Sequence, residues 1–397
     1  MSTQIQMSKE DLSNELKLLL AMLDDNSVDD LAMEFNELLE VVNWNHVIEL
    51  ARHHRVFPYI NKEIQKMKDA NIPPFVLQMF QRDFYRNTLL MLSLSGEMEQ
   101  IAKLFSENAI RTLFLKGPII AADLYGDVSL RTSSDLDLLV PLNDLPKAEQ
   151  LLEGLGYVKD EYIDTILNDW KWRHHHVTFI HPEKKIKVEI HWRLNPFPSK
   201  EPHFIQLWER KRKSSLINRP IYYLGREDLF LFLVTHGARH GWSRLRWLLD
   251  IKKLISQPID WVKLTALLKK HQYLHLGSLA VFLCVRLFSI PLQEGMKPLL
   301  HSRKGEWLVQ DTMFYIQRMI NLHSEPLTAE VSSYHKKYLF SLLTAKQKGL
   351  FIASFLYPYP EDAQTLRLPK PIHFLYFPLR PVLWAVRKHR ERSSLDM

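Results

Sequence analysis

Several common signatures of enzymes and secreted proteins are missing from this sequence. Its 397 residues contain a single cysteine, Cys284, so no disulfide can form within the chain. No Gly-Lys pair occurs, which excludes the P-loop of many ATPases. Neither Gly-x-Gly-x-x-Gly nor His-Glu-x-x-His is found, which removes the usual patterns of dinucleotide-binding dehydrogenases and zinc proteases. Any chemistry of this chain must rest on a different pattern.

Glycine is scarce and long apolar runs are few. The chain has 12 glycines against 21 prolines, a composition that favours helices joined at proline breaks over a β-sandwich with many turns. Its most apolar stretch, 276–292, is interrupted by Arg286 and closed by Pro291, and it is shorter than the ~20 residues of a membrane-spanning helix. We expect a buried helix there. Residues 1–10 lack the pattern of a signal peptide, which together with the lone cysteine predicts a cytoplasmic protein.

Positive charge is in excess. The formal net charge is +7 and the isoelectric point is about 9.2, which favours nucleotides, nucleic acid or an acidic membrane surface as partners. Part of the excess lies in two clusters, at 210–213 and 387–392, where an ordinary solvated surface is the alternative. The proportions of apolar and charged residues, 46% and 24%, are those of folded globular proteins.

The periodicity of apolar residues divides the chain into four parts. Helical spacing predicts an N-terminal helical region (1–105) and a C-terminal helical region (201–357). Between them, at 106–200, short apolar runs and apolar/polar alternations predict strands at 112–115, 136–140, 177–180 and 186–192. The last two of these strands should form a hairpin. Helices are predicted in the same part of the chain at 119–125 and 145–155. The proline-rich tail (358–397) should contain no continuous helix before Val382. The predicted fold class is α+β.

The clearest chemical signal is Asp135-Leu136-Asp137. Alternate residues of a strand share a face, so both carboxylates point the same way, and such close like charges favour a hard cation between them. The strand at 186–192 offers Glu189 on its polar face. If the two strands are neighbours, Asp135, Asp137 and Glu189 form a catalytic cluster that holds two Mg²⁺ ions, or Mn²⁺ in their place, for phosphoryl transfer. An isolated Asp-x-Asp pair is usually only a wet loop or strand edge.

These residues and their surroundings resemble a known family. The segments that carry the similarity are Leu115-Lys116-Gly117, Leu124-Tyr125-Gly126, Arg131, 135–140, 188–194, 50–58, 236–240 and 248–250. Through them the chain is similar to the bacterial "uncharacterised nucleotidyltransferase" family of the polymerase-β superfamily. The likeness covers roughly residues 40–255. It implies a polymerase-β-like core, a small mixed sheet with helices, flanked by helical regions. It also implies transfer of a nucleoside monophosphate from an NTP, foremost ATP, to an acceptor.

Further residues are candidates for binding. The superfamily holds phosphates with a Gly-Ser or Gly-Gly turn, whereas this chain has Lys116-Gly117-Pro118. We expect Lys116 and Arg131 to offer charge to the phosphates, with Gly117, Ser133 and Ser134 as further nucleotide contacts. Candidate substrate contacts are His176, His191, Arg193, His236, His240, Arg244 and Asp250.

Some of these candidates have alternative roles. His236 and His240, four apart on a helix, could hold zinc, although a core or surface role is more common. Asp250 could equally be a structural partner between helices. His176 or His191 could act as a general base. Consecutive strand residues oppose one another, so only one residue of His174–His176 should face the active-site cleft.

The acid cluster and the family resemblance together predict a nucleotidyltransferase. Its acceptor would be a hydroxyl or phosphate on a small molecule, peptide or protein, because no compact basic and aromatic groove for nucleic acid is readable. The alternative is a non-catalytic scaffold of the same fold that senses a nucleotide or a partner. A third, weaker hypothesis concerns the tail, whose aromatic residues and following cations at 374–387 could rest on an anionic membrane surface. Packing against the C-terminal helices is the alternative for the tail.

Overall fold

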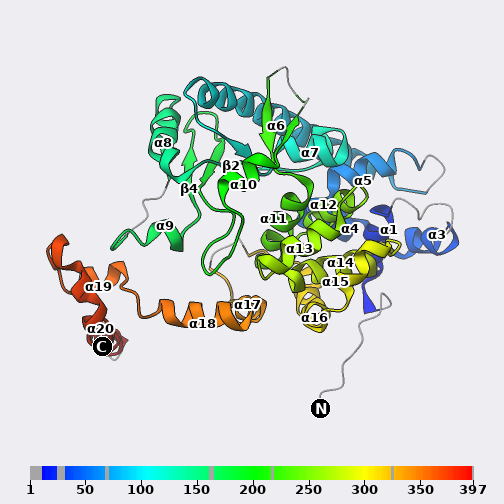
Figure 1. Ribbon diagram of the computed structural model, residues 1–397. Helices are drawn as coiled ribbons and strands as arrows, with labels where there is room; N and C mark the ends of the chain where they lie inside the picture. Colours follow the sequence, from blue (N-terminus) through cyan, green and yellow to red (C-terminus); the bar gives the residue numbers. More distant parts are fainter. Residues whose placement is uncertain are drawn as a thin grey trace, which may run out of the picture.

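The computed structural model describes residues 11–24, 32–67, 71–160, 165–214, 216, 219–322 and 326–395. Within them, seven strands form one mixed sheet with the order β3-β4-β5-β2-β1-β7-β6. The strands are β1 (Leu113–Phe114), β2 (Asp135–Leu139), β3 (Val158–Lys159), β4 (His176–Ile180), β5 (Lys187–His191), β6 (Arg212–Ser214) and β7 (Ile221–Tyr223). The chain is thus a mixed protein of helices around a central sheet (Figure 1).

The centre of the sheet is the parallel pair β2 and β5. Asp137 lies opposite Glu189 in this pair, and β4 and β5 form the predicted antiparallel hairpin. Leu136 and Val188 point into the core with no exposed side-chain surface, as their alternation predicted. Strands β6 and β7 were not predicted and extend the sheet past residue 200. With three residues each, they are too short to carry an alternation signal.

The first part of the chain is helical up to Glu107. Its helices are α1 (Asn14–Met22), α3 (Ala32–Val41), α4 (Trp44–His53), α5 (Phe57–Ile64) and α6 (Pro74–Glu107). The 34-residue α6 runs along the sheet (Figure 1) and buries Met91, Leu94, Met98, Ile101 and Phe105, a spacing of three and four. The predicted helices of the core appear as α7 (Pro118–Tyr125) and α8 (Leu145–Gly154), with the short η2 (Val128–Leu130), η3 (Leu142–Asp144) and α9 (Trp170–Arg173).

A second group of helices packs beneath the sheet. It comprises α10 (Phe204–Glu209), α11 (Arg226–Arg239), α12 (Leu245–Ile255), α13 (Trp261–Lys270), α14 (Leu274–Phe288), η4 (Glu294–Met296), α15 (Lys297–Leu300) and α16 (Arg303–Gln317). Helix α14 corresponds to the predicted buried helix, and Cys284 within it is fully buried. Among the described residues, no helix is both long enough and apolar enough to cross a membrane.

The last part of the chain forms an arm of helices. It consists of α17 (Ala329–Leu342), α18 (Ala345–Ser354), α19 (Pro360–Thr365), η5 (Lys370–Leu375) and α20 (Tyr376–Leu395). The expectation of no helix before Val382 was wrong, because α20 begins six residues earlier. Pro378 lies in its first turn, where a helix N–H has no partner to lose, and Pro381 removes only one interior hydrogen bond.

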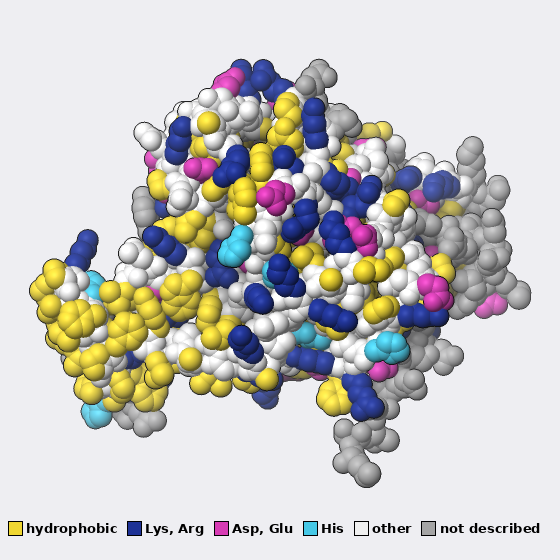
Figure 2. All heavy atoms as spheres, viewed as in Figure 1, with side chains coloured by type: hydrophobic (Ala, Val, Ile, Leu, Met, Phe, Trp, Pro, Cys, Tyr) yellow, Lys and Arg dark blue, Asp and Glu magenta, His cyan; other side chains and the backbone are white. Residues whose placement is uncertain are grey.

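The arm presents a broad apolar surface. Figure 2 shows hydrophobic side chains gathered over α18 to α20. They include Phe355, Leu356, Phe374, Val382 and Trp384, which are 50%, 69%, 58%, 60% and 54% exposed. Tyr376 and Leu383 of the arm form a second small core with Ile166, which lies in the segment before α9. The tail therefore packs in part, while much of its apolar surface faces outward.

Candidate functional site

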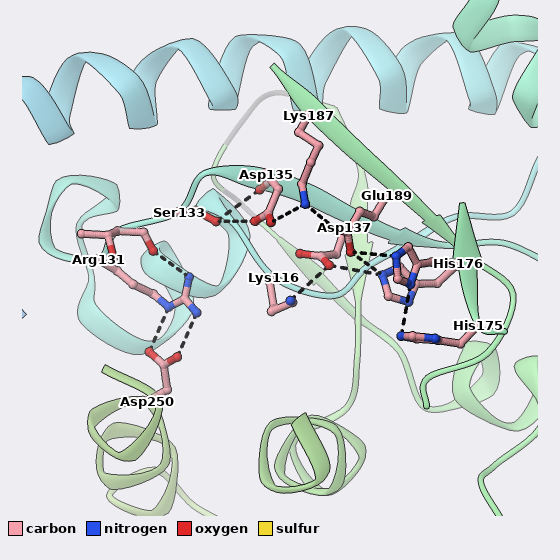
Figure 3. A network of polar contacts seen from close by, with 12 residues as sticks. Lys116, Arg131, Ser133, Asp135, Asp137, His175, His176, Lys187, Glu189 and Asp250 are labelled. Atoms are coloured by element: carbon pink, nitrogen blue, oxygen red, sulfur yellow. Dashed lines mark hydrogen bonds and ion pairs between the residues drawn. The ribbon is translucent and has the colours of Figure 1, made fainter. Parts of the chain in front are cut away.

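Two acids from neighbouring strands meet at the centre of the candidate site (Figure 3). The side chain of Asp137 on β2 has no exposed surface, and its Oδ1 atom lies 3.1 Å from Nζ of Lys116 and 3.2 Å from Nε2 of His191. On β5, Oε2 of Glu189 lies 3.5 Å from the same nitrogen of His191. The expectation that the two strands would bring these acids together is confirmed. His191 joins them because it also lies on β5, two positions after Glu189.

Lys187 links the third acid to this pair. Its Nζ lies 2.6 Å from Oε1 of Glu189 and 3.7 Å from Oδ2 of Asp135. Asp135 is the most exposed of the three acids, with 23% of its side chain accessible. It forms the outer edge of the cluster, and Asp137 forms the buried end.

Burial and charge oppose one another at these groups. Burial alone would raise the pKa of Asp137, but the positive charge of Lys116 and the hydrogen bond from His191 hold it below its usual value. Burial would also raise the pKa of Glu189, and the hydrogen bond and charge of His191 lower it well below its ordinary range. For His191, burial lowers the pKa, but its hydrogen bonds to both acids prevail and raise it. Both carboxylates are therefore ionised at neutral pH.

The donor atoms fit a bound cation. One ligand atom each from Asp137, Glu189 and His191 lies within 4.8 Å of the others, and so does one each from His175, His176 and His191. Across the described ranges, Oδ2 of Asp137 is buried without a hydrogen-bond partner, as is Nδ1 of His191. A buried carboxylate oxygen that lacks a donor is a group that a metal would satisfy. The first set has the oxygen ligands that Mg²⁺ and Mn²⁺ prefer, whereas the second, of three imidazoles, suits softer ions.

The turn before α7 brings Lys116 to the acids. Gly117 has φ = +83°, a conformation that residues with a side chain rarely adopt. A Cβ at this position would lie 3.4 Å from Cδ2 of Leu136, so the turn packs closely on β2. Pro118 then begins α7 without an N–H group. At this turn, Lys116 is the group that can offer positive charge.

Arg131 lies away from the acid cluster. Its guanidinium donates two hydrogen bonds of 2.9 Å to the two carboxylate oxygens of Asp250 on α12, and the residue is only 1% exposed. Tyr125 donates a further hydrogen bond of 2.7 Å to Asp250. This buried triad holds together α7, α12 and the segment that leads into β2. The structure therefore gives Arg131 and Asp250 a positioning role.

The two predicted serines differ in their contacts. Ser133 is buried, and its hydroxyl is 3.2 Å from the carbonyl oxygen of Asp135 and 3.4 Å from Oδ1 of the same residue. Ser134 is exposed at the start of β2. Ser133 therefore orients Asp135, and Ser134 is the more accessible of the two to a ligand.

Of the remaining predicted contacts, only His176 lies at the acids. Its Nε2 is 3.9 Å from Oε2 of Glu189. Arg193 turns away, with Nε 3.6 Å from Oε1 of Glu201, and Arg244 donates a 2.8 Å hydrogen bond to Asn321. His236 and His240 contact each other's rings at 4.6 Å, and both rings pack against Trp247.

Three residues near the acids were missed or misjudged. His175 and His176 both reach the cluster, with 3.1 Å between Nε2 of His175 and Nδ1 of His176, so the expectation that only one of these neighbours faces the cleft was wrong. The reason is that β4 begins only at His176, so strand alternation does not apply to His175. Lys187 could have been found, because it shares a strand face with Glu189. Arg239, at the end of α11, lies in the family-like segment 236–240 but was not among the predicted contacts.

Comparison with known proteins gives one match. The model of a family described as "Uncharacterised nucleotidyltransferase" matches residues 40–289, a range that contains the sheet and the acid cluster. Searches of the curated proteins and of the solved structures found no match.

Proposed function

Because this chain belongs to the uncharacterised nucleotidyltransferase family, we propose that it is a Mg²⁺-dependent enzyme that transfers a nucleoside monophosphate from ATP to an acceptor. The acceptor oxygen would be a hydroxyl or phosphate on a small molecule or peptide. The observation that carries the proposal is the pairing of Asp137 with Glu189 on parallel strands, with one buried oxygen of Asp137 lacking a partner.

Asp137 and Glu189 would hold the ion, with Asp135 at the open edge of the site. When bound, Mg²⁺ would neutralise charge on the triphosphate and activate the acceptor oxygen. Lys116, 12% exposed, would reach the phosphates from the turn before α7. Nε2 of His191 stands between the two carboxylates and donates its proton there, so it orients them. His176, whose Nε2 lies 3.9 Å from Oε2 of Glu189, is the imidazole that would accept a proton from the acceptor.

The test is transfer of label from [α-³²P]ATP to small-molecule and peptide fractions, together with ATP binding measured with and without Mg²⁺. Asp137→Asn and Glu189→Gln keep the shape of each side chain and remove its charge. We expect each to reduce transfer by on the order of 10²–10³-fold, because the cation site is lost. Glu306→Gln on α16, in an exposed ion pair with Arg286, is the matched control and should leave transfer unchanged. Full transfer by both site variants would reject the proposal.

One observation favours the non-catalytic scaffold as the alternative. Lys116 and Lys187 already pair with the three acids, so much of their negative charge is balanced without a metal. A scaffold would bind ATP equally well with and without Mg²⁺, and Asp137→Ala would leave that affinity intact. Loss of Mg²⁺-dependent binding in this variant would exclude the scaffold.

We also propose that the arm contacts an anionic membrane surface peripherally. Its exposed aromatic residues include Phe374 and Trp384, which lie four positions in sequence from the exposed cations Lys370 and Lys388. Such a combination suits the boundary between lipid headgroups and acyl chains. Anionic lipids are concentrated on the cytoplasmic face, which agrees with a cytoplasmic enzyme.

A further inference from the structure

A pocket of about 520 Å³ lies between the end of α11, the segment 195–199 and the arm. This volume is in the range of small-molecule sites. Its walls come from parts of the chain that are far apart in sequence, so the pocket exists only when the arm is docked. Its apolar wall includes Phe197, Leu339, Phe340 and Phe351.

Among the described residues, the pocket wall is mostly apolar and its charged groups are positive. Leucine, phenylalanine and proline side chains make up most of the wall, and within the described chain no aspartate or glutamate lines it. The two charged residues are Arg239 and Lys336. Lys336 is exposed on α17, whereas Arg239 is half-buried. This arrangement is complementary to a ligand with an apolar body and one negative group.

Arg239 is a cation with one unpaired donor atom. Its Nη1 atom is buried and, over the ranges that the structure covers, has no hydrogen-bond acceptor. Burial lowers the pKa of Arg239 to about 10, so the guanidinium keeps its charge at neutral pH. A buried donor of a charged group is costly to leave unpaired, and a carboxylate matches the fork of a guanidinium. Arg131, which is fully buried, has such a carboxylate from Asp250.

The pocket wall approaches the acid cluster at Arg239, where burial lowers the pKa and the charges of Glu189 and Asp137 oppose that larger effect. The charge of Arg239 is close enough to lower the pKa of His175, together with the larger effect of burial. The ring of His175 lies 4.3 Å from that of His176 and 5.4 Å from that of His191, centroid to centroid. A second pocket, of about 650 Å³, is lined by His175 and His176 and shares Phe197 and Phe351 with the first. A molecule in the first pocket would therefore be within reach of the imidazole cluster.

We propose that this pocket binds the acceptor, and that the acceptor is an apolar molecule with a carboxylate held by Arg239. The carboxylate anchors the molecule and is distinct from the oxygen that receives the nucleotidyl group. The acceptor role rests on the proposed function, whereas the binding of an apolar carboxylate does not. A triphosphate is a poor occupant, because most of the wall would desolvate its charges without compensation. An alkyl acid and the free C-terminus of an apolar peptide share the required chemistry.

The test is calorimetric titration of the full chain with decanoate, decanol and decylammonium. We expect decanoate to bind at least tenfold more tightly than decanol, and decylammonium not to bind. Arg239→Met should remove the difference between decanoate and decanol, while Arg239→Lys should keep part of it. Arg303→Met, at an exposed arginine on α16, is the control and should behave as wild type. Equal affinities of the wild type for decanoate and decanol would overturn the proposal.

A second variant tests the pocket without touching the charge. Leu339→Trp should fill the pocket and weaken decanoate and decanol alike. An N-acetylated tripeptide of leucine, leucine and phenylalanine, with a free or amidated C-terminus, separates the two sources of carboxylate. If only the free-acid peptide binds, the acceptor is a peptide; if only decanoate binds, it is an alkyl acid.

Nucleotide binding separates this inference from the proposed function. Arg239→Met should leave the affinity for Mg²⁺-ATP unchanged. If this variant instead loses that affinity tenfold and still binds decanoate, Arg239 belongs to the phosphate site and the inference is overturned. Asp137→Asn should abolish Mg²⁺-dependent ATP binding and leave decanoate binding intact. Decanoate binding in a wild-type protein that transfers no label would reject the proposed function while the pocket stands.

Discussion

The buried pair of Arg131 and Asp250 should be one of the most sensitive points of the fold. Asp250 has no exposed surface, Arg131 has 1%, and two hydrogen bonds of 2.9 Å join them. Asp250→Ala would leave the guanidinium buried without its counter-charge, which costs about 3–5 kcal/mol. Tyr125→Phe removes only one hydrogen bond, of 2.7 Å, and should cost about 1 kcal/mol. The predicted order is therefore a large loss for Asp250→Ala and a small one for Tyr125→Phe.

Urea unfolding followed by tryptophan fluorescence measures this order. With an m-value of ~3 kcal/mol/M, a loss of about 3 kcal/mol lowers the midpoint by ~1 M. Glu330→Ala breaks an exposed ion pair with Arg318 and is the control, with an expected change below about 1 kcal/mol. The double variant Arg131→Met with Asp250→Leu should be more stable than Asp250→Ala, because no charge is left unpaired. A midpoint of Asp250→Ala within about 0.2 M of wild type would refute the reasoning.

Two further predictions concern acid stability and the arm. Burial lowers the pKa of His275 to about 4, and its Nε2 lies 2.6 Å from the carbonyl oxygen of Leu342. Because the unfolded chain binds the proton more tightly, stability is lost as the pH falls from about 6.5 towards 4, by about 2 kcal/mol at pH 5. The urea midpoint of the wild type should therefore be lower at pH 5 than at pH 7, and His275→Gln should reduce this difference. The same difference in the variant as in the wild type would show that His275 is not the source of the acid sensitivity. For the arm, Trp384→Glu should reduce co-sedimentation with phosphatidylserine vesicles several-fold. The control is Trp307→Glu, at a 65% exposed tryptophan on α16, which should not change co-sedimentation. If the two variants pellet with the vesicles equally, the proposed membrane contact is rejected.

The fold could be anticipated wherever a local pattern determines the structure. The spacing of apolar residues in α6 and the alternation in β4 and β5 were sufficient to predict these elements. Alternation also placed Glu189 on the polar face of its strand. That β5 pairs in parallel with β2, opposite Asp137, was an assumption from the sequence, because the register between distant strands depends on tertiary packing.

The remainder of the site depends on contacts between elements. Arg131 was expected to meet phosphates because it is a cation close to the aspartates in sequence, yet Asp250, 119 residues later, pairs with it. The site role of Arg239 is invisible in the sequence, since it depends on how α11 and the arm enclose a pocket. His175 was misjudged because the first residue of a strand cannot be fixed to one position by pattern alone.

The parallel pairing of β2 with β5 has a consequence for how the site forms. Asp137 and His191 are 54 positions apart, and the connection between them contains α8, β3, α9 and β4. The acids come together only after that long loop has closed, an entropic cost that local helices do not bear. Partial unfolding that detaches the β4–β5 hairpin would therefore disperse the metal ligands while the helices of both flanking regions persist. Metal affinity would then report on the integrity of the sheet before far-ultraviolet circular dichroism changes.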